Sequence, residues 1–429
     1  MVQAMQHDGQ TLTFTRTRQA AELVHRYAQD CLRRERSPLA DQLRAYRGGY
    51  LPNERREIEQ ALFNGRLRGV AATNALELGI DIGSLDVALL VHYPGTIAST
   101  WQQAGRSGRR QSESLAILLA GNDPVDQYLL RHPQYFFQQS PEHAVVDPQN
   151  TYVLAKHLKA AAFELPLDEQ LSAGFGEKAE AVAEVLCQAN ELAPVAGKIY
   201  FSGGQNPAQQ ISLRHMSDET FSIVLCRAQQ ELAHAAPKRK SLPTTPVARS
   251  LGTPRHEMAC EHQVIANVDA ISAPELIYPE AVYLHNGQSY FVRELDLEGR
   301  VAYVERHEMD YYTQAVLDSS VDIRRTTSRS ETLARARLAY GEVDVSWKTV
   351  AFKKIKFSTR ENIGYGTVDL PAQNLPTMAF WLTPSPEIRQ QMKTAGYRPS
   401  EGLCGLRNLA VVALPMIAMC DSRDISGVV

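Results

Sequence analysis

The sequence predicts an α/β lobe built on a parallel sheet, then a small helical winged-helix-like module, then a mostly β C-terminal region. Three observations support this division. Strand-like and helix-like segments alternate over residues 1–140, and the strands are apolar on both faces, which is typical of a parallel sheet covered by helices on both sides. Helical periodicity follows from Asp147, and an alternation of apolar and polar residues follows from Val264.

The elements of the first lobe follow from local patterns. Residues 10–15 are β-rich and lead directly into apolar positions that repeat at helical spacing, so a strand feeds a helix. Pro52 suits the first turn of a helix that we expect to run to about Phe63. We assign residues 1–140 to one domain, whose remaining expected elements are strands near 44–46, 67–73, 85–92 and 114–119 and a helix over about 99–109.

A helical module and a linker are expected next. Helices at 151–163 and 177–188, followed by short β stretches at 198–202 and 210–214, predict a winged-helix-like module over residues 141–225. Repeated prolines mark 226–263 as an exposed insertion or linker. Its basic cluster at 238–240 is compatible with nucleic-acid contact, but a solvated loop is the favoured reading.

A small β domain is expected over residues 264–385. The pair Asn286-Gly287 lies between β-prone runs and is a strong signal for a hairpin turn. Residues 386–429 contain an apolar helix near 403–417 and look like the start of a truncated zinc-binding-type region. We expect the chain to continue beyond this point, because nothing in the sequence closes that last unit.

Composition excludes several classes of protein. The chain has 429 residues, 44% apolar and 22% charged, with a formal net charge of -3, which is typical of a globular protein and not of one that binds nucleic acid through bulk positive charge. Six scattered cysteines form neither a disulfide framework nor a zinc ribbon, so a reducing, cytoplasmic setting is expected. No signal peptide is visible, and we expect no run that approaches a membrane span.

Two arginines three residues apart suit phosphoryl chemistry. Arg106 and Arg109 each follow a glycine, Gly105 and Gly108, and we expect these glycines to let both guanidinium groups reach one phosphate chain. An arginine inserted from a second lobe stabilises the charge on a γ-phosphate during hydrolysis. The alternative is a basic surface turn, which the preceding Gln102 and the loop upstream disfavour.

The loop that follows an expected strand offers further polar groups. Thr73, Asn74, Gly79 and Asp81 lie at the carboxyl end of a strand, where open α/β sheets bind ligands. Asp81 is placed to hold a ribose hydroxyl or a water, and Thr73 to contact a nucleic-acid phosphate. A role for Asp81 as a helix cap is the alternative, although it does not account for Thr73.

These motifs resemble the second RecA-like lobe of a superfamily 2 helicase. Residues 13–16 resemble motif IV, residues 72–81 motif V and residues 102–109 motif VI. The resemblance implies that Arg109 is the arginine finger, that Arg106 and Gln102 face the nucleotide together with Gly79, Asp81 and Gly105, and that Thr15, Arg16, Thr73 and Asn74 track the DNA backbone.

A narrower resemblance covers most of the chain. Residues 150–152, 157–167, 283–290, 294–296 and 310–313 are similar to DNA-repair helicases that end in a four-cysteine zinc domain, a group of bacterial mitomycin-repair helicases and fungal RecQ-like relatives. This implies a DNA-dependent ATPase that moves 3′ to 5′ on single-stranded or forked DNA. The location implied is the bacterial cytosol, or the nucleus of a eukaryote.

Parts of such an enzyme are absent from these 429 residues. The sequence contains no Gly-x-x-x-x-Gly-Lys-Ser/Thr phosphate loop and no acidic metal-binding box. ATP and Mg²⁺ would therefore need a first RecA-like lobe, and the chain alone is expected to be inactive. Zinc is possible in the complete enzyme, but we predict no metal ligand here. The competing hypotheses are a non-enzymatic nucleic-acid-binding or regulatory remnant and an RNA helicase lobe.

Overall fold

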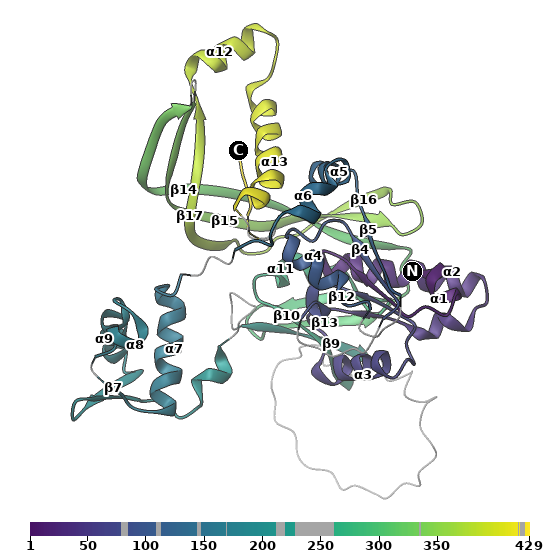
Figure 1. Cartoon of the computed structure of the whole chain (residues 1–429), viewed down its shortest axis with the longest axis horizontal. Helices are drawn as coiled ribbons and strands as arrows, with labels where there is room; N and C mark the ends of the chain where they lie inside the picture. Colours follow the sequence, from purple (N-terminus) through teal and green to yellow (C-terminus); the bar gives the residue numbers. More distant parts are fainter. Residues whose placement is uncertain are drawn as a thin grey trace, which may run out of the picture. The chain divides into compact units, whose positions relative to one another are not determined.

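The computed structural model describes residues 1–78, 85–108, 113–143, 147–168, 170–211, 219–227, 261–333, 336–418, 420 and 425–429 (Figure 1). These form two compact units, one made of residues 1–142 with 221–429 and the other of residues 143–220. The predicted site residues Gly79, Asp81 and Arg109 lie outside the described residues, as does most of the β stretch expected at 210–214.

A five-stranded sheet forms the centre of the first lobe, in the order β2-β3-β1-β4-β5. Each neighbouring pair is parallel, and Leu12 of β1 lies beside Val70 of β3 and Ala88 of β4. The predicted parallel sheet is therefore confirmed. The strands are β1 (Thr11–Phe14), β2 (Leu43–Tyr46), β3 (Gly69–Ala72), β4 (Val87–Val91) and β5 (Leu115–Leu119).

Helices pack on this sheet through fully buried apolar side chains, among them Phe14, Tyr46 and Leu62. The helix expected to start at Pro52 runs to Phe63, as predicted. Thr17 caps α2 by accepting a hydrogen bond from the Ala20 amide. The helices of the lobe are α1 (Val2–Gln6), α2 (Arg18–Arg34), η1 (Pro38–Gln42), α3 (Pro52–Phe63), η2 (Asn74–Leu76), α4 (Ile97–Ala104), α5 (Pro124–Arg131) and α6 (Pro133–Gln138).

The second unit is a small helical module with a three-stranded sheet. Leu154, Leu158 and Leu186 form its core with residues of the sheet, whose strand order is β6-β8-β7. Asn150 caps the first helix by accepting from two backbone amides. The elements are α7 (Thr151–Glu164), β6 (Leu167–Asp168), α8 (Ser172–Phe175), α9 (Ala179–Gln188), β7 (Leu192–Val195), β8 (Lys198–Phe201) and η3 (Pro207–Gln210).

The C-terminal region is mostly β. One sheet has the order β10-β9-β13-β12-β11, and a second joins β14, β15, β16 and β17. Asn286 and Gly287 have φ values of 48° and 76°, so the predicted hairpin turn joins β11 and β12. The elements are β9 (Thr220–Arg227), β10 (Glu261–Asp269), α11 (Ala273–Leu276), β11 (Val282–His285), β12 (Gln288–Asp296), β13 (Val301–Arg306), β14 (Tyr311–Leu333), β15 (Ala336–Lys356), β16 (Asn362–Thr367) and β17 (Gln373–Pro384).

Two features of this region differ from the sequence expectations. Strand β9 pairs in parallel with β13, so residues 221–227 belong to the β region, and the helical unit ends at Thr220, whereas the sequence placed its end at 225. The structure also has a long antiparallel ribbon of β14 and β15, 23 and 21 residues in length, which Figure 1 shows as an extended arm. The sequence analysis assigned these residues to a β domain but did not predict the ribbon, because β14 is largely polar and lacks a clear alternation.

Two helices end the described chain, α12 (Pro386–Thr394) and α13 (Pro399–Ala418). Val412 and Met416 of α13 pack on Val125 and Leu129 of α5. By length and composition alone α13 is able to cross a membrane. The expectation that no run approaches a membrane span is therefore wrong for this helix.

Candidate nucleotide and nucleic-acid site

Five parallel strands end at one edge of the sheet, and most of the predicted site residues follow them. Thr15 and Arg16 come after β1, Thr73 and Asn74 after β3, and His92 after β4. Parallel strands place the residues beyond their carboxyl ends along a common edge, which is where open α/β sheets bind ligands. The sheet topology therefore gathers the predicted DNA-contacting residues.

Arg106 joins the two motif-bearing stretches directly. Its side chain is 7% exposed, and its Nε donates to the backbone carbonyl of Glu77 at 2.9 Å. One terminal guanidinium nitrogen donates to the same oxygen. Residues 74–78 after β3 are thus fastened to the end of α4. This contact with backbone was not anticipated, since the sequence suggested a guanidinium directed at phosphate.

Glu77 and Gln103 were both missed by the sequence analysis. The Glu77 carboxylate is buried and accepts from Gln103 Nε2 at 2.9 Å and from Ser99 Oγ at 2.7 Å. Ser99 and Gln103 are four residues apart and therefore share one face of α4. Gln102, the predicted nucleotide contact, lies on the exposed side of the same helix. The position of each glutamine around the helix is therefore the sequence signal that distinguishes the buried Gln103 from the exposed Gln102.

The two motif glycines have different conformations. Gly108 has a φ of +86°, a left-handed conformation that favours glycine. Gly105 ends α4 with a φ of -68°, which any residue adopts. The expectation that both glycines are needed for a tight turn is therefore correct for Gly108 and wrong for Gly105, where a Cβ would instead lie 3.0 Å from the Trp101 carbonyl oxygen.

The predicted DNA-tracking threonines are buried, whereas Asn74 is exposed. Thr15 Oγ1 lies 3.2 Å from the carbonyl oxygens of both Thr17 and Ala72, and donates to one of them at a time. The Thr73 amide donates to the carbonyl of Tyr46 at 3.2 Å. Of these three residues, Asn74 presents its side chain most openly at the start of η2.

Arg16 is held by the protein. Its Nε and Nη2 donate to the Tyr93 carbonyl at 2.8 and 2.6 Å. Nη2 also lies 3.4 Å from Asp126, and Nη1 lies 3.9 Å from Asp123. Part of the positive charge expected to face DNA is thus already paired with carboxylates.

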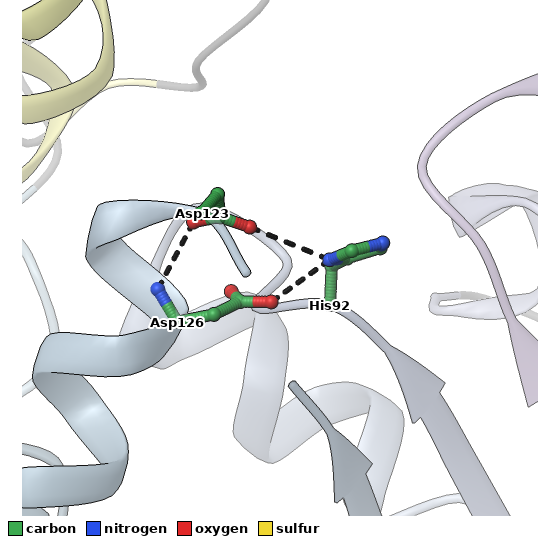
Figure 2. A group of neighbouring side chains, drawn as sticks. All are labelled: His92, Asp123 and Asp126. Atoms are coloured by element: carbon green, nitrogen blue, oxygen red, sulfur yellow. Dashed lines mark hydrogen bonds and ion pairs between the residues drawn. The ribbon is translucent and has the colours of Figure 1, made fainter. Parts of the chain in front are cut away.

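His92, Asp123 and Asp126 form a compact cluster beside Arg16 (Figure 2). His92 Nδ1 lies 2.8 Å from Asp126 and 3.4 Å from Asp123. Asp126 is fully buried and accepts from the amides of Tyr93 at 2.9 Å and Gly121 at 2.7 Å. Burial alone raises the pKa of Asp126, but the two amides, His92 and Arg16 outweigh that effect and hold the pKa below its ordinary value.

A metal ion is a poor fit to this cluster. Its potential ligand atoms lie within 4.8 Å of one another. However, each oxygen of Asp126 already accepts a hydrogen bond from a backbone amide, and the Arg16 guanidinium supplies the neighbouring positive charge. We therefore assign the cluster to hydrogen bonding within the protein, not to metal binding.

A small cavity of about 170 Å³ opens at this edge. It brings together three of the predicted DNA-contacting residues, Thr15, Arg16 and Asn74, with His92. It does not include Gln102 or Arg106. The remaining lining residues are Phe14, Thr17, Val91, Pro94, Ser99 and Gln103.

The N-terminus of α4 holds a carboxylate from another part of the chain. Glu142 accepts from the amide of Ile97 at 2.6 Å and from that of Ala98 at 3.0 Å. A carboxylate is stabilised there because the first amides of a helix have no partner within it and the helix dipole is positive at that end. Glu142, the last residue of the first unit's N-terminal segment, is thereby tied to the helix that carries the motif VI-like residues.

Trp101, on α4, is 46% exposed and stacks on Phe136 with ring centroids 5.1 Å apart. The indole is therefore not a buried core side chain. Its surroundings are apolar and include Phe137 and residues of β5. The surface differs in this respect from the cavity at the carboxyl edge, whose lining includes Arg16, Asn74 and His92.

The parallel sheet and the motifs along its edge are those of the second RecA-like lobe of a superfamily 2 helicase. Residues 1–111 match the family model of the helicase conserved C-terminal domain. Residues 146–216 match the winged helix domain of the ATP-dependent helicase HRQ1. The chain thus contains the C-terminal helicase lobe and the winged helix of a helicase of this class.

Particular relatives extend this similarity along nearly the whole chain. The sequence is 38% identical over 417 residues to the ATP-dependent helicase YprA of Bacillus subtilis, which covers 97% of this chain and 51% of YprA. It is 28% identical over 352 residues to the ATP-dependent helicase hrq1 of Schizosaccharomyces pombe, covering 80% of this chain and 29% of that protein.

Among solved structures, the helicase MrfA bound to DNA is similar with a TM-score of 0.72 and 36% identity, over 98% of this chain and 52% of MrfA. A complex of MrfA with DNA and AMPPNP gives a TM-score of 0.69. The chain spans about half the length of YprA and of MrfA.

Proposed function

We propose that this chain works as the C-terminal part of an ATP-dependent helicase that moves 3′ to 5′ on DNA and acts in DNA repair. The observation that supports this most directly is the bond of Arg106 to the Glu77 carbonyl, because it connects the motif V-like loop to the motif VI-like helix. Such a connection lets a change at the nucleotide reach the residues at the DNA edge. The similarity to MrfA bound to DNA supports the choice of nucleic acid.

The proposed roles divide between two ligands. Arg109 acts as the arginine finger, and Arg106 and Gln102 serve the catalytic site. Gly79, Asp81 and Gly105 belong to the nucleotide side, where ATP and Mg²⁺ are completed by a first RecA-like lobe. Thr15, Arg16, Thr73 and Asn74 belong to the DNA side, and the strand bound is single-stranded or forked DNA.

The proposed setting follows from the same assignment. The enzyme works in the bacterial cytosol, or in the nucleus if its source is a eukaryote. Zinc is assigned to a four-cysteine region of the complete enzyme, and no ligand for it is proposed among residues 1–429. The α13 helix is assigned to packing on α5, in keeping with the contacts of Val412 and Met416.

The test is turnover in a polypeptide that includes the first lobe. Arg109→Ala is expected to abolish DNA-stimulated ATP hydrolysis and to leave DNA affinity nearly unchanged, because the finger acts on transition-state charge. DNA and RNA oligonucleotides compared as stimulators distinguish a DNA helicase from an RNA helicase. Unchanged ATP turnover in Arg109→Ala would show that Arg109 is not the arginine finger. An absence of turnover in the wild type would favour the hypothesis of a non-enzymatic nucleic-acid-binding protein.

A further inference from the structure

His92 lies at the end of β4 in a backbone conformation that non-glycine residues rarely adopt. Its φ is +68°. The strand-like bond from its amide to the Leu119 carbonyl, 2.9 Å long, holds this conformation. The Asp126 carboxylate holds the ring at the same time. Backbone strain of this kind persists only where the surrounding structure enforces it, and it concentrates at functional positions.

The imidazole ring is held so that Nδ1 contacts carboxylates and Nε2 faces away from them. Nδ1 faces Asp126 and Asp123, and Figure 2 shows the second ring nitrogen pointing away from both carboxylates. Gly121 lies against the ring so closely that a Cβ at that position would collide with it. The side chain is 41% exposed, and no hydrogen bond to Nε2 is present within the described part of the chain.

Among the described residues that line the cavity, Nε2 of His92 lies where the other polar side chains offer no free cation. Arg16 lines the same cavity, but the Tyr93 carbonyl and Asp126 already engage its guanidinium. Asn74 is exposed there but is uncharged. Of the lining residues that the structure describes, His92 is the ionisable one with an outward-facing nitrogen that has no partner.

We propose that Nε2 of His92 donates to a phosphate oxygen of the DNA strand that crosses the carboxyl edge. The proposal rests on the proposed function, in which this edge binds DNA. When a phosphate lies at Nε2 and Asp126 lies at Nδ1, the doubly protonated ring has an anion on each side, so binding favours the imidazolium. Asp126 then acts as the positioning residue that aims the ring.

The charged groups that face His92 are Asp123 and Asp126 from the start of α5 and Arg16 from the loop after β1. Because a phosphate at Nε2 favours the doubly protonated ring, the contribution of His92 to DNA affinity is expected to weaken as pH rises.

The experiment measures fluorescence anisotropy of a labelled oligothymidylate with the 429-residue chain, at fixed salt and at pH 6, 7 and 8. His92→Asn is the main variant, because asparagine tolerates a positive φ and still donates to Asp126. Affinity at pH 6 is expected to fall about tenfold, the size of one charge-assisted hydrogen bond. His92→Lys is expected to retain affinity and to lose the pH dependence that the wild type shows.

The control is His307→Gln, at an exposed histidine of the β region, which is expected to bind as the wild type does. Each variant is checked by thermal unfolding, which shows whether a loss of affinity is due to misfolding. Normal DNA binding by His92→Asn overturns the His92 assignment and leaves the proposed function standing. An absence of DNA binding by the wild type overturns both the His92 assignment and the proposed function. If EDTA removes the effect of the His92 substitution, His92 binds a metal ion and not a phosphate.

Discussion

Arg47 Nε lies 2.8 Å from Glu22 Oε1, and the two side chains are only 2% and 1% exposed. Tyr50 donates to the same carboxylate at 2.7 Å, and the Gly287 amide donates to its second oxygen at 3.0 Å. Arg47 also donates to the Tyr283 hydroxyl at 2.9 Å. The ion pair therefore fastens the helicase lobe to the β11–β12 hairpin of the β region.

Arg47→Met is expected to destabilise the chain by about 3–5 kcal/mol, because it leaves the Glu22 carboxylate buried without its partner. The matched control is Arg293→Met, which removes an exposed ion pair with Glu305 at the same distance of 2.8 Å and is expected to cost less than about 1 kcal/mol. Urea unfolding measures both. Equal costs for the two variants would show that the buried network does not hold these parts together.

Stability is expected to fall in acid in two stages. Burial lowers the pKa of His25, an effect that the nearby Glu22 charge only partly offsets, so the native state resists protonation of the imidazole. Burial raises the pKa of Glu22, but Arg47, the Gly287 amide, His285 and Tyr50 outweigh it and hold the pKa below its ordinary value. The pKa values of both groups are lower in the folded state than in the unfolded chain. Each group therefore stabilises the fold above its unfolded pKa, and this stabilisation is lost as pH falls.

The windows for the two groups differ. The His25 contribution begins to fall below about pH 6.5 and the Glu22 contribution below about pH 4.3, their values in unfolded chains. Urea unfolding from pH 8 to pH 4 measures the slope. His25→Gln is expected to flatten the upper part, and an unchanged slope between pH 6.5 and 5 in that variant would assign the effect to other groups.

The sequence predicts what is set by local structure and misses what is set by distant contacts. Pro52 and Asn286-Gly287 act through their own backbone preferences, so the helix start and the hairpin were predicted correctly. Arg47 lies 25 residues from Glu22 and 236 from Tyr283, and nothing in the surrounding residues marks it as buried. Such a network becomes visible only when the sheet topology is known.

The candidate site shows the same division. The resemblance to helicase motifs grouped Thr15, Arg16 and Asn74, and the structure places these three residues around one cavity because parallel strands end together. Sequence could not show that Arg16 is paired with Asp126, which is 110 residues away. Nor could it show the role of His92, whose ring is aimed by the same aspartate.

Gln102→Ala and Gln103→Ala lie on one helix but are expected to have different effects, the first on catalysis and the second on stability. Gln103→Ala removes a buried donor to the Glu77 carboxylate, 2.9 Å away, and is expected to cost about 1–3 kcal/mol of stability. Gln102 is exposed, so its replacement is expected to leave stability unchanged and to reduce ATP turnover in a polypeptide that includes the first lobe. Thermal unfolding and DNA-stimulated hydrolysis measure the two effects. Loss of stability in Gln102→Ala would contradict the exposed position of this residue.

Glu142→Gln tests whether the carboxylate at the start of α4 positions this helix. The change keeps the size of the side chain and removes its charge, so the amides of Ile97 and Ala98 no longer face a carboxylate and the favourable interaction with the helix dipole is lost. A decrease in stability of about 1 kcal/mol is expected, and it should shrink as salt concentration rises. Glu298→Gln, at an exposed turn of the β region, is the control and is expected to have no effect.

Because α4 carries Gln102 and Gln103, Glu142→Gln should also lower ATP turnover more than it lowers DNA affinity. A salt-independent loss, or equal losses in the two variants, would mean that the contact of Glu142 with α4 does not operate through its charge.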